Sequence, residues 1–174
     1  MDHKIPPTGH EVFFDEQDII VSKTDLKGRI TYANHTFMNI AGYSEKELLG
    51  KPHSIIRHPD MPRAVFKLLW DTLVEKDEVF AYVINLAKNG DHYWVLAHVT
   101  PSIDTSGEII SYHSSRRVPD PTIISNHVIP LYKDLLAIEQ SVSNRKEGMN
   151  KAYEQLGNTL TEKDISYNEL ILTL

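Results

Sequence analysis

The first apolar positions of the chain form two short β-branched runs separated by a turn. Ile19 to Thr24 and Arg29 to Ala33 flank the tetrad Asp25 to Gly28. A turn that starts with Asp and ends with Gly between two such runs is typical of a β-hairpin. Asn34 then occupies a position that suits a helix N-cap. We therefore expect two paired strands followed by a helix.

Helical spacing governs the next stretch. Gly42 is expected to end the first short helix, and Ser44 with Glu47 fits a capping box that opens a second one. A longer amphipathic helix is predicted from residue 63 to about residue 76. Its apolar face consists of Val65, Phe66, Leu69, Trp70 and Leu73.

Three runs of strand character follow, at residues 79–87, 92–101 and 109–117. Both connecting segments contain Asn, Asp or Gly, which tolerate the backbone angles of tight turns. The middle run places large side chains on both faces. One face is therefore expected to cover a core or ligand, and the other to be covered by the N-terminal arm, the C-terminal helices or a partner subunit.

Two closely spaced prolines, Pro119 and Pro121, mark a boundary after the last strand. Beyond them the pattern is helical, and apolar residues recur every seven positions at Leu135, Val142, Met149 and Leu156. The companion seam is poor, and Gly148 and Gly157 weaken a continuous helix. Docking of this segment on its own sheet and pairing with a second copy of the chain both remain open.

These patterns predict an α+β protein with three parts. We expect an N-terminal arm at residues 1–14, loosely ordered over about its first twelve residues. A folded domain is expected at residues 15–118, and a C-terminal helical linker segment at residues 119–174.

Composition narrows the functional classes. A chain of 174 residues can form one domain with an appendage, and its net charge of −6 with scattered basic residues argues against nucleic acid as a partner. The absence of cysteine excludes disulfides, thiolate metal sites and cysteine nucleophiles. No signal peptide or membrane-spanning stretch is apparent, so we expect a cytoplasmic protein.

The densest candidate site is the hexad Arg57-His58-Pro59-Asp60-Met61-Pro62. Its prolines restrict the backbone, so Arg57, His58 and Asp60 are held by a segment that cannot form one helix. Rigid presentation of polar side chains suits a ligand site. The alternative is a tight loop between helices in which Arg57 and Asp60 pair with each other.

The order of elements resembles that of a PAS domain, a five-stranded antiparallel sheet with short helices on one face, here followed by C-terminal helices. The hexad and the run from Lys88 to Val95 make the chain similar to the PAS sensors of bacterial aerotaxis receptors over roughly residues 15–118. Further residues that carry the resemblance are Asp25, Leu26, Ile30, Thr31, Tyr32, Ala33, Asn34, Phe37, Gly42, Tyr43, Gly50, Pro52, His53 and Trp70.

This resemblance implies a sensor that holds FAD non-covalently and reports redox or oxygen status to chemotaxis signalling. It implies flavin-site roles for Arg57, His58 and Asp60. The positions implied to line or support the pocket are Asn34, Phe66, Trp70 and Asn85. It also implies a homodimer and a downstream chemoreceptor or signalling domain as partner.

Other interpretations remain for several of these residues. Trp70 fits a core position on its helix, and His58 fits a turn cap. His53 and His58 would be candidate ligands if the cavity held heme instead. The chain could also be a ligand-free dimerisation module that uses the arm and the outer sheet face near Tyr93 or Trp94. An enzyme is not expected, because no nucleophile set, metal site or phosphate loop accompanies the hexad.

Overall fold

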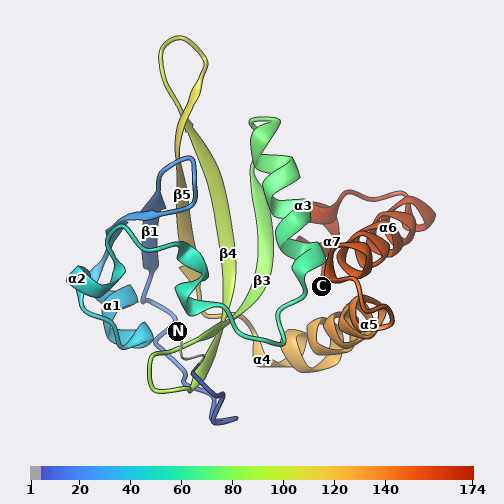
Figure 1. The fold of residues 1–174 in the computed structure, drawn as a ribbon, viewed down its shortest axis with the longest axis horizontal. Helices are drawn as coiled ribbons and strands as arrows, with labels where there is room; N and C mark the ends of the chain where they lie inside the picture. The colour runs from blue at the N-terminus through green and yellow to red at the C-terminus, as the bar shows by residue number, and fades with distance from the viewer. Residues whose placement is uncertain (1–4) are drawn as a thin grey trace.

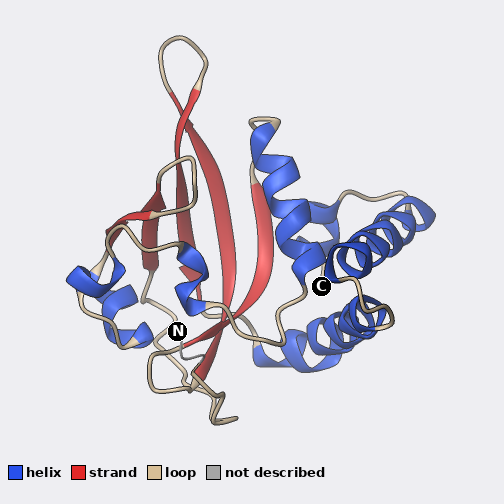
Figure 2. Ribbon diagram, in the orientation of Figure 1, coloured by secondary structure: helices blue, strands red, loops and turns tan. Residues whose placement is uncertain are grey.

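The computed structural model describes residues 5–174 and has a five-stranded sheet at its centre (Figures 1 and 2). The strand order is β2-β1-β5-β4-β3, and every neighbouring pair is antiparallel. The strands are β1 (Ile20–Thr24), β2 (Ile30–Ala33), β3 (Val79–Leu86), β4 (His92–Ile103) and β5 (Ile109–Arg117). The predicted α+β fold with an antiparallel sheet is confirmed.

Local sequence signals explain the helices between β2 and β3. Asn34 caps α1 (His35–Ala41) by accepting from the Phe37 amide, and Gly42 ends it with a left-handed φ of 73°. Ser44 and Glu47 form the predicted capping box of α2 (Glu45–Leu48). A 3-10 helix η1 (His53–Ile56) precedes the hexad, and α3 (Arg63–Val74) follows it.

One face of the sheet is covered by these helices. On β3 and β4, Val83, Asn85, Tyr93 and Val95 share this inner face, since Asn85 lies opposite Tyr93 in the register. Tyr93 and Val95 are completely buried. The inner face and α3 therefore enclose the space in which a ligand site can form.

The C-terminal segment is a group of helices rather than one long helix. It comprises α4 (Pro121–Ile123), the π-helical turn η2 (Ile124–Val128), α5 (Ile129–Gln140), α6 (Arg145–Lys163) and α7 (Tyr167–Leu172). In Figure 1, α5, α6 and α7 lie beside α3 and β3.

These helices also cover outer-face residues of β3 and β4. The Tyr132 hydroxyl of α5 donates to the carbonyl of Tyr82, and its ring lies 6.1 Å from Trp94. Trp94 is 7% exposed as a result. The heptad spacing left open whether this segment docks on its own sheet or pairs with a second copy. In the described chain, it docks on its own domain.

The described part of the N-terminal arm is docked, in contrast to the loose order expected from sequence. The amides of Thr8 and Val12 donate to the carbonyls of Gly90 and His92, both at 2.8 Å. Residues 5–12 thus pack along the β3–β4 turn, while residues 1–4 of the predicted arm lie outside the described residues.

None of the helices formed by residues 5–174 combines the length and the apolar character needed to cross a bilayer.

Candidate functional site

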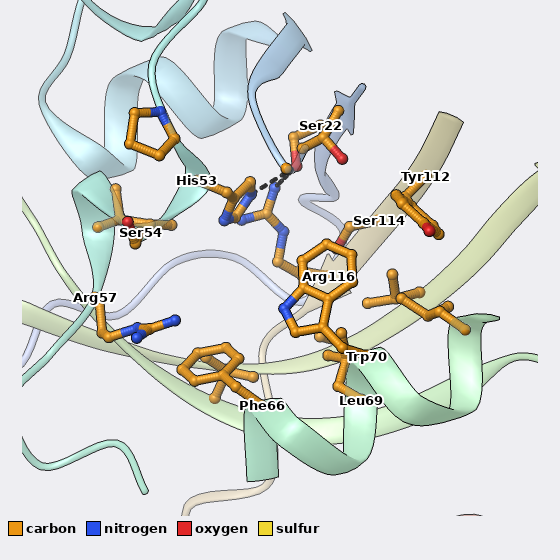
Figure 3. A pocket seen from close by; sticks show the side chains of 18 of the residues that line it. Ser22, His53, Ser54, Arg57, Phe66, Leu69, Trp70, Tyr112, Ser114 and Arg116 are labelled. Carbon is orange, nitrogen blue, oxygen red and sulfur yellow. Dashed lines mark hydrogen bonds between the residues drawn. The ribbon is translucent and has the colours of Figure 1, made fainter. Parts of the chain in front are cut away.

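A cavity of about 240 Å³ lies between the inner face of the sheet, η1 and α3 (Figure 3). Its apolar and glycine lining residues are Gly28, Pro52, Ile56, Phe66, Leu69, Trp70, Leu73, Val83, Ala97, Val99 and Tyr112. Its other lining residues are Ser22, Thr24, Lys27, His53, Ser54, Arg57, Asn85, His113, Ser114 and Arg116. Four of the seven predicted site residues are among them.

Arg57 is placed at the cavity wall by the end of η1. Its backbone forms a β-bridge with Asn85 of β3, so the hexad begins against the strand that carries a second predicted residue. The guanidinium lies 4.3 Å from the centre of the Phe66 ring and is directed toward the cavity (Figure 3). Within residues 5–174 it has no hydrogen-bond or ion-pair partner, so the alternative pairing with Asp60 is not formed.

The inner end of the cavity holds a second arginine. Arg116 of β5 is 3% exposed, and its Nη2 donates to Ser22 Oγ at 2.6 Å. His53 Nε2 lies 3.0 Å from the same hydroxyl. Figure 3 shows the three side chains meeting there.

Burial controls the charges of this cluster. It lowers the pKa of Arg116 to about 10, an effect that Tyr93 opposes. It also lowers the pKa of His53 to about 3, with the charge of Arg116 as a further cause. At pH 7 the cluster therefore contains a neutral His53 and a positive Arg116.

Several buried donors of cavity-lining side chains have no partner among the described residues. They are Nε and Nη1 of Arg116, Nδ2 of Asn85 and the hydroxyl of Thr24. Buried polar groups are costly when unpaired, and a buried charge is costlier still. The unpaired donors of Arg116, Asn85 and Thr24 thus belong to side chains that line the cavity at different levels of the sheet.

Aromatic side chains of α3 form the opposite wall. Trp70 is 37% exposed and meets Tyr112 of β5 edge to face, with ring centroids 5.2 Å apart. Phe66 lies one turn earlier on the same helix, beneath Arg57. Trp70 therefore faces the cavity rather than a closed core, and a flat aromatic ligand would suit these walls.

Asn34 lies outside the cavity lining and has a structural task. Its Oδ1 accepts from the amides of Val21 and Phe37, and its Nδ2 donates to the carbonyl of Ile19. The amide thus ties α1 to β1. A supporting role at the pocket stays a prediction.

His58 and Asp60 also lie outside the lining. His58 is buried, and its Nδ1 accepts from the Asp60 amide at 3.1 Å, which is the turn cap considered from sequence. The Asp60 carboxylate is largely exposed, 3.8 Å from His58 Nδ1. Their direct contact with a cofactor stays a prediction.

The two histidines considered for heme do not share a site. His53 lines the cavity, whereas the ring of His58 is turned to His92 at 5.6 Å. The described chain also contains no group of three or more His, Asp or Glu side chains that could hold a metal ion.

Sequence reasoning missed Ser22 and Arg116 as site residues and considered His53 only as a heme ligand. A signal for Arg116 was available, because alternate residues of a strand share a face. Tyr112, Ser114 and Arg116 all line the cavity. For Ser22 no local signal distinguishes it from other strand serines.

Comparison with known proteins agrees with this architecture. Residues 30–116 match the PAS fold family. The chain is 46% identical over 119 residues to the aerotaxis receptor of Escherichia coli (strain K12), covering 68% of this chain and 23% of the receptor. It is 30% identical over 103 residues to the nitrogen fixation regulatory protein of Klebsiella pneumoniae, covering 59% of this chain and 21% of that protein.

Solved structures show the same fold. The light-state structure of the blue-light photoreceptor Aureochrome1 LOV superposes with a TM-score of 0.57 at 24% identity, over 63% of this chain and 88% of that one. The matched curated proteins are several times longer than this chain, which spans less than a quarter of each. From the family match, the aerotaxis-receptor identity and the fold together, the chain belongs to the PAS family, and its PAS domain is of the aerotaxis-receptor type.

Proposed function

We propose that this chain is a redox sensor that binds a flavin, FAD, non-covalently in the cavity of its PAS domain. The observation that carries the proposal is a cavity lined both by the polar side chains of Arg57, Asn85 and Arg116 and by the aromatic rings of Phe66 and Trp70. The edge of a flavin ring offers carbonyl oxygens and ring nitrogens as acceptors, and its faces are flat and apolar. The cavity residues fit both properties.

A bound flavin would supply reversible reduction, which changes the charge at the ring edge. Arg116 is fixed by Ser22 at the inner end and stays positive at pH 7, so it favours a more negative edge. His53 is held neutral by the same surroundings and does not compete as a cation. Asn85 can both donate and accept, so it can adjust to either state of the ring.

Strand β5 offers a route from the cavity to the C-terminal helices. Tyr112, Ser114 and Arg116 line the cavity, and α4 begins at Pro121, only five residues after Arg116. A ligand can shift a conformational equilibrium only through contacts that differ between its states. The contacts of Arg116 with a flavin would differ between the oxidised and the reduced ring. We therefore expect residues 119–174 to act as the output segment.

The oligomeric state, the location and the output partner of the sensor are proposed from its relatives. The aerotaxis receptor similarity supports a homodimeric cytoplasmic sensor whose output reaches a chemoreceptor or signalling domain. The chain contains no cysteine, so a flavin would be held without a thiol adduct. This favours a redox stimulus over light-driven bond formation to the protein.

The test begins with the absorption spectrum of the purified chain, followed by denaturation and chromatography of any released chromophore. We expect flavin bands and release of FAD. We also expect Arg57→Ala and Asn85→Ala to lower FAD affinity about tenfold each, because each removes a polar side chain of the cavity lining. Asn158→Ala, an exposed substitution on α6, is the matched control.

Two results would contradict the proposal. A colourless protein that also refuses added FAD would instead support a PAS interaction module with no flavin. Wild-type FAD affinity in both Arg57→Ala and Asn85→Ala would show that the flavin, if bound, lies elsewhere.

A further inference from the structure

A second hollow, a groove of about 390 Å³, lies between α3 and the first turns of α6. Figure 1 shows α3 between the strands and α6, and the two helices are in contact. The residues of the groove that matter here are Arg57, Arg63, Phe66, Trp70, Lys146 and Asn150. Arg57, Phe66 and Trp70 also line the cavity, so the groove begins where the cavity opens.

The groove has an excess of positive charge. Asp71 is its one acidic lining residue among those described, and Lys67 already binds it at 2.7 Å. Two further carboxylates are nearby: Glu139 accepts from the Ala64 amide at 2.8 Å, and Glu147 of α6 pairs with Lys151 at 3.0 Å. The positive charges of Arg57, Arg63 and Lys146 therefore exceed the negative charge available to balance them.

Arg57 lies at this junction with an exposed side chain, beside the second positive charge of Arg63. Partial burial lowers its pKa, and the neighbouring charge of Arg63 lowers it further, while Glu139 opposes the shift. Its guanidinium stacks on Phe66 and finds no carboxylate within residues 5–174. An anion placed at the cavity opening would be attracted by both arginines.

The start of α6 adds to this attraction. Asn144 caps the helix by accepting from the amides of Lys146 and Glu147, and Lys146, the second residue of the helix, lines the groove. Arg63 Nη1 donates to the carbonyl of Arg145 at 2.7 Å and fixes this helix start to α3.

The size of the cavity indicates what the anion is attached to. At about 240 Å³ it is smaller than the roughly 300–1,000 Å³ of pockets that enclose a whole drug-sized ligand. A flavin ring inside it would leave its phosphate-bearing chain outside, and the side that the cavity shares with the groove, at Arg57, Phe66 and Trp70, offers this chain a way out. This way out leads into the positive groove.

We propose that the groove between α3 and α6 binds the phosphate groups of the flavin nucleotide whose ring occupies the cavity. The inference rests on the proposed function and adds α6 of the C-terminal segment to the ligand site. It also couples ligand binding to the position of α6, because a ligand that binds only when α6 is docked stabilises the docked arrangement. Phosphate-bearing flavins are thereby preferred over riboflavin.

The test compares FAD, FMN and riboflavin as ligands of the full chain after its cofactor has been removed. Lys146→Glu reverses one groove charge, and a glutamate is favoured near a helix N-terminus, so α6 should remain folded. The matched control is Lys133→Glu, the same change at an exposed position of α5 outside the groove. Equilibrium titration by flavin fluorescence gives each affinity.

We expect Lys146→Glu to weaken FAD binding about tenfold while riboflavin binding stays the same, and Lys133→Glu to change neither. Added salt should weaken FAD binding to the wild type more than to Lys146→Glu. Asn150→Asp, which adds one negative charge to the groove, should weaken FAD binding in the same direction.

Wild-type binding of all three flavins with no effect of Lys146→Glu or Asn150→Asp on FAD would overturn this inference alone. An equal loss of FAD and riboflavin affinity in Lys146→Glu would also overturn it, because a structural change would then explain both. Failure of the wild type to bind any of the three flavins would overturn the proposed function, and the phosphate site with it.

Discussion

At the scale of single residues, Arg116 carries a buried charge that is unfavourable for folding and that can help to bind a ligand in the cavity. It is a buried cation with one hydrogen bond from Nη2 to Ser22 Oγ and no carboxylate partner in the part of the chain that the structure describes. Burying a charge without compensation costs several kcal/mol. A ligand that accepts hydrogen bonds from Arg116 would offset this cost.

Replacement of Arg116 by methionine should separate stability from binding. We expect Arg116→Met to raise the free energy of unfolding of the flavin-free protein, because the buried charge has no carboxylate partner and its loss outweighs that of the Ser22 hydrogen bond and the contact with the Phe37 ring. Flavin affinity should fall at least tenfold. Urea unfolding and flavin titration measure the two effects.

Arg117→Met is the matched control, since Arg117 is the next residue and is exposed. It should change the free energy of unfolding by less than about 0.5 kcal/mol and leave flavin affinity unchanged. A flavin-free Arg116→Met protein that is less stable than the wild type and binds flavin normally would show that Arg116 is a structural residue.

At the scale of elements, the two glycines of α6 have different environments. A Cβ on Gly148 would lie 2.1 Å from the carbonyl oxygen of Glu139 on α5, whereas a Cβ on Gly157 would meet nothing within 4 Å. Gly148 therefore permits the close approach of α5 and α6. From sequence, both glycines were interpreted only as weak points of a helix.

The two alanine substitutions should act in opposite directions. Gly157→Ala should raise the free energy of unfolding by about 0.5–1 kcal/mol, because alanine has the higher helix propensity. Gly148→Ala should lower it by about 1–3 kcal/mol, because the methyl group forces α5 and α6 apart. Urea unfolding followed by circular dichroism compares them, and stabilisation by both would contradict the close contact.

At the scale of the whole molecule, the C-terminal helices and the PAS domain share one core. Leu135 and Leu156 belong to the same cluster of buried side chains as Val79 and Trp94. The sequence boundary at the prolines near residue 120 is thus a change of element type, and the packing continues across it. We expect the described chain to unfold as one cooperative unit.

Leu156→Ala tests this continuity, since Leu156 is 1% exposed on α6. The cavity it leaves should lower the free energy of unfolding by about 2–5 kcal/mol. Trp94 packs against Tyr132 of α5, so amide hydrogen exchange, which reports each element separately, is the measurement of choice. Equal protection loss in α6 and the central strands of Leu156→Ala would support one unit, and opening of α5 and α6 with full protection of β4 and β5 would mean that the helices form a separate unit.

The sequence by itself determined the elements, while its ligand-site residues stay predictions. The hairpin, the Asn34 cap, the capping box at Ser44, α3 and the last three strands follow from local spacing and turn residues, and all are present. These signals act within a few residues, so they can be read without knowing the fold. The hexad likewise indicated Arg57 at a ligand wall.

Only the tertiary structure decided which distant side chains meet. Ser22 and Arg116 are 94 positions apart, and their contact depends on the register of β1 against β5. The docking of α6 beside Arg57 depends on packing at Gly148. Such contacts arise from strand register and helix packing over the whole chain, and no local pattern of residues encodes them.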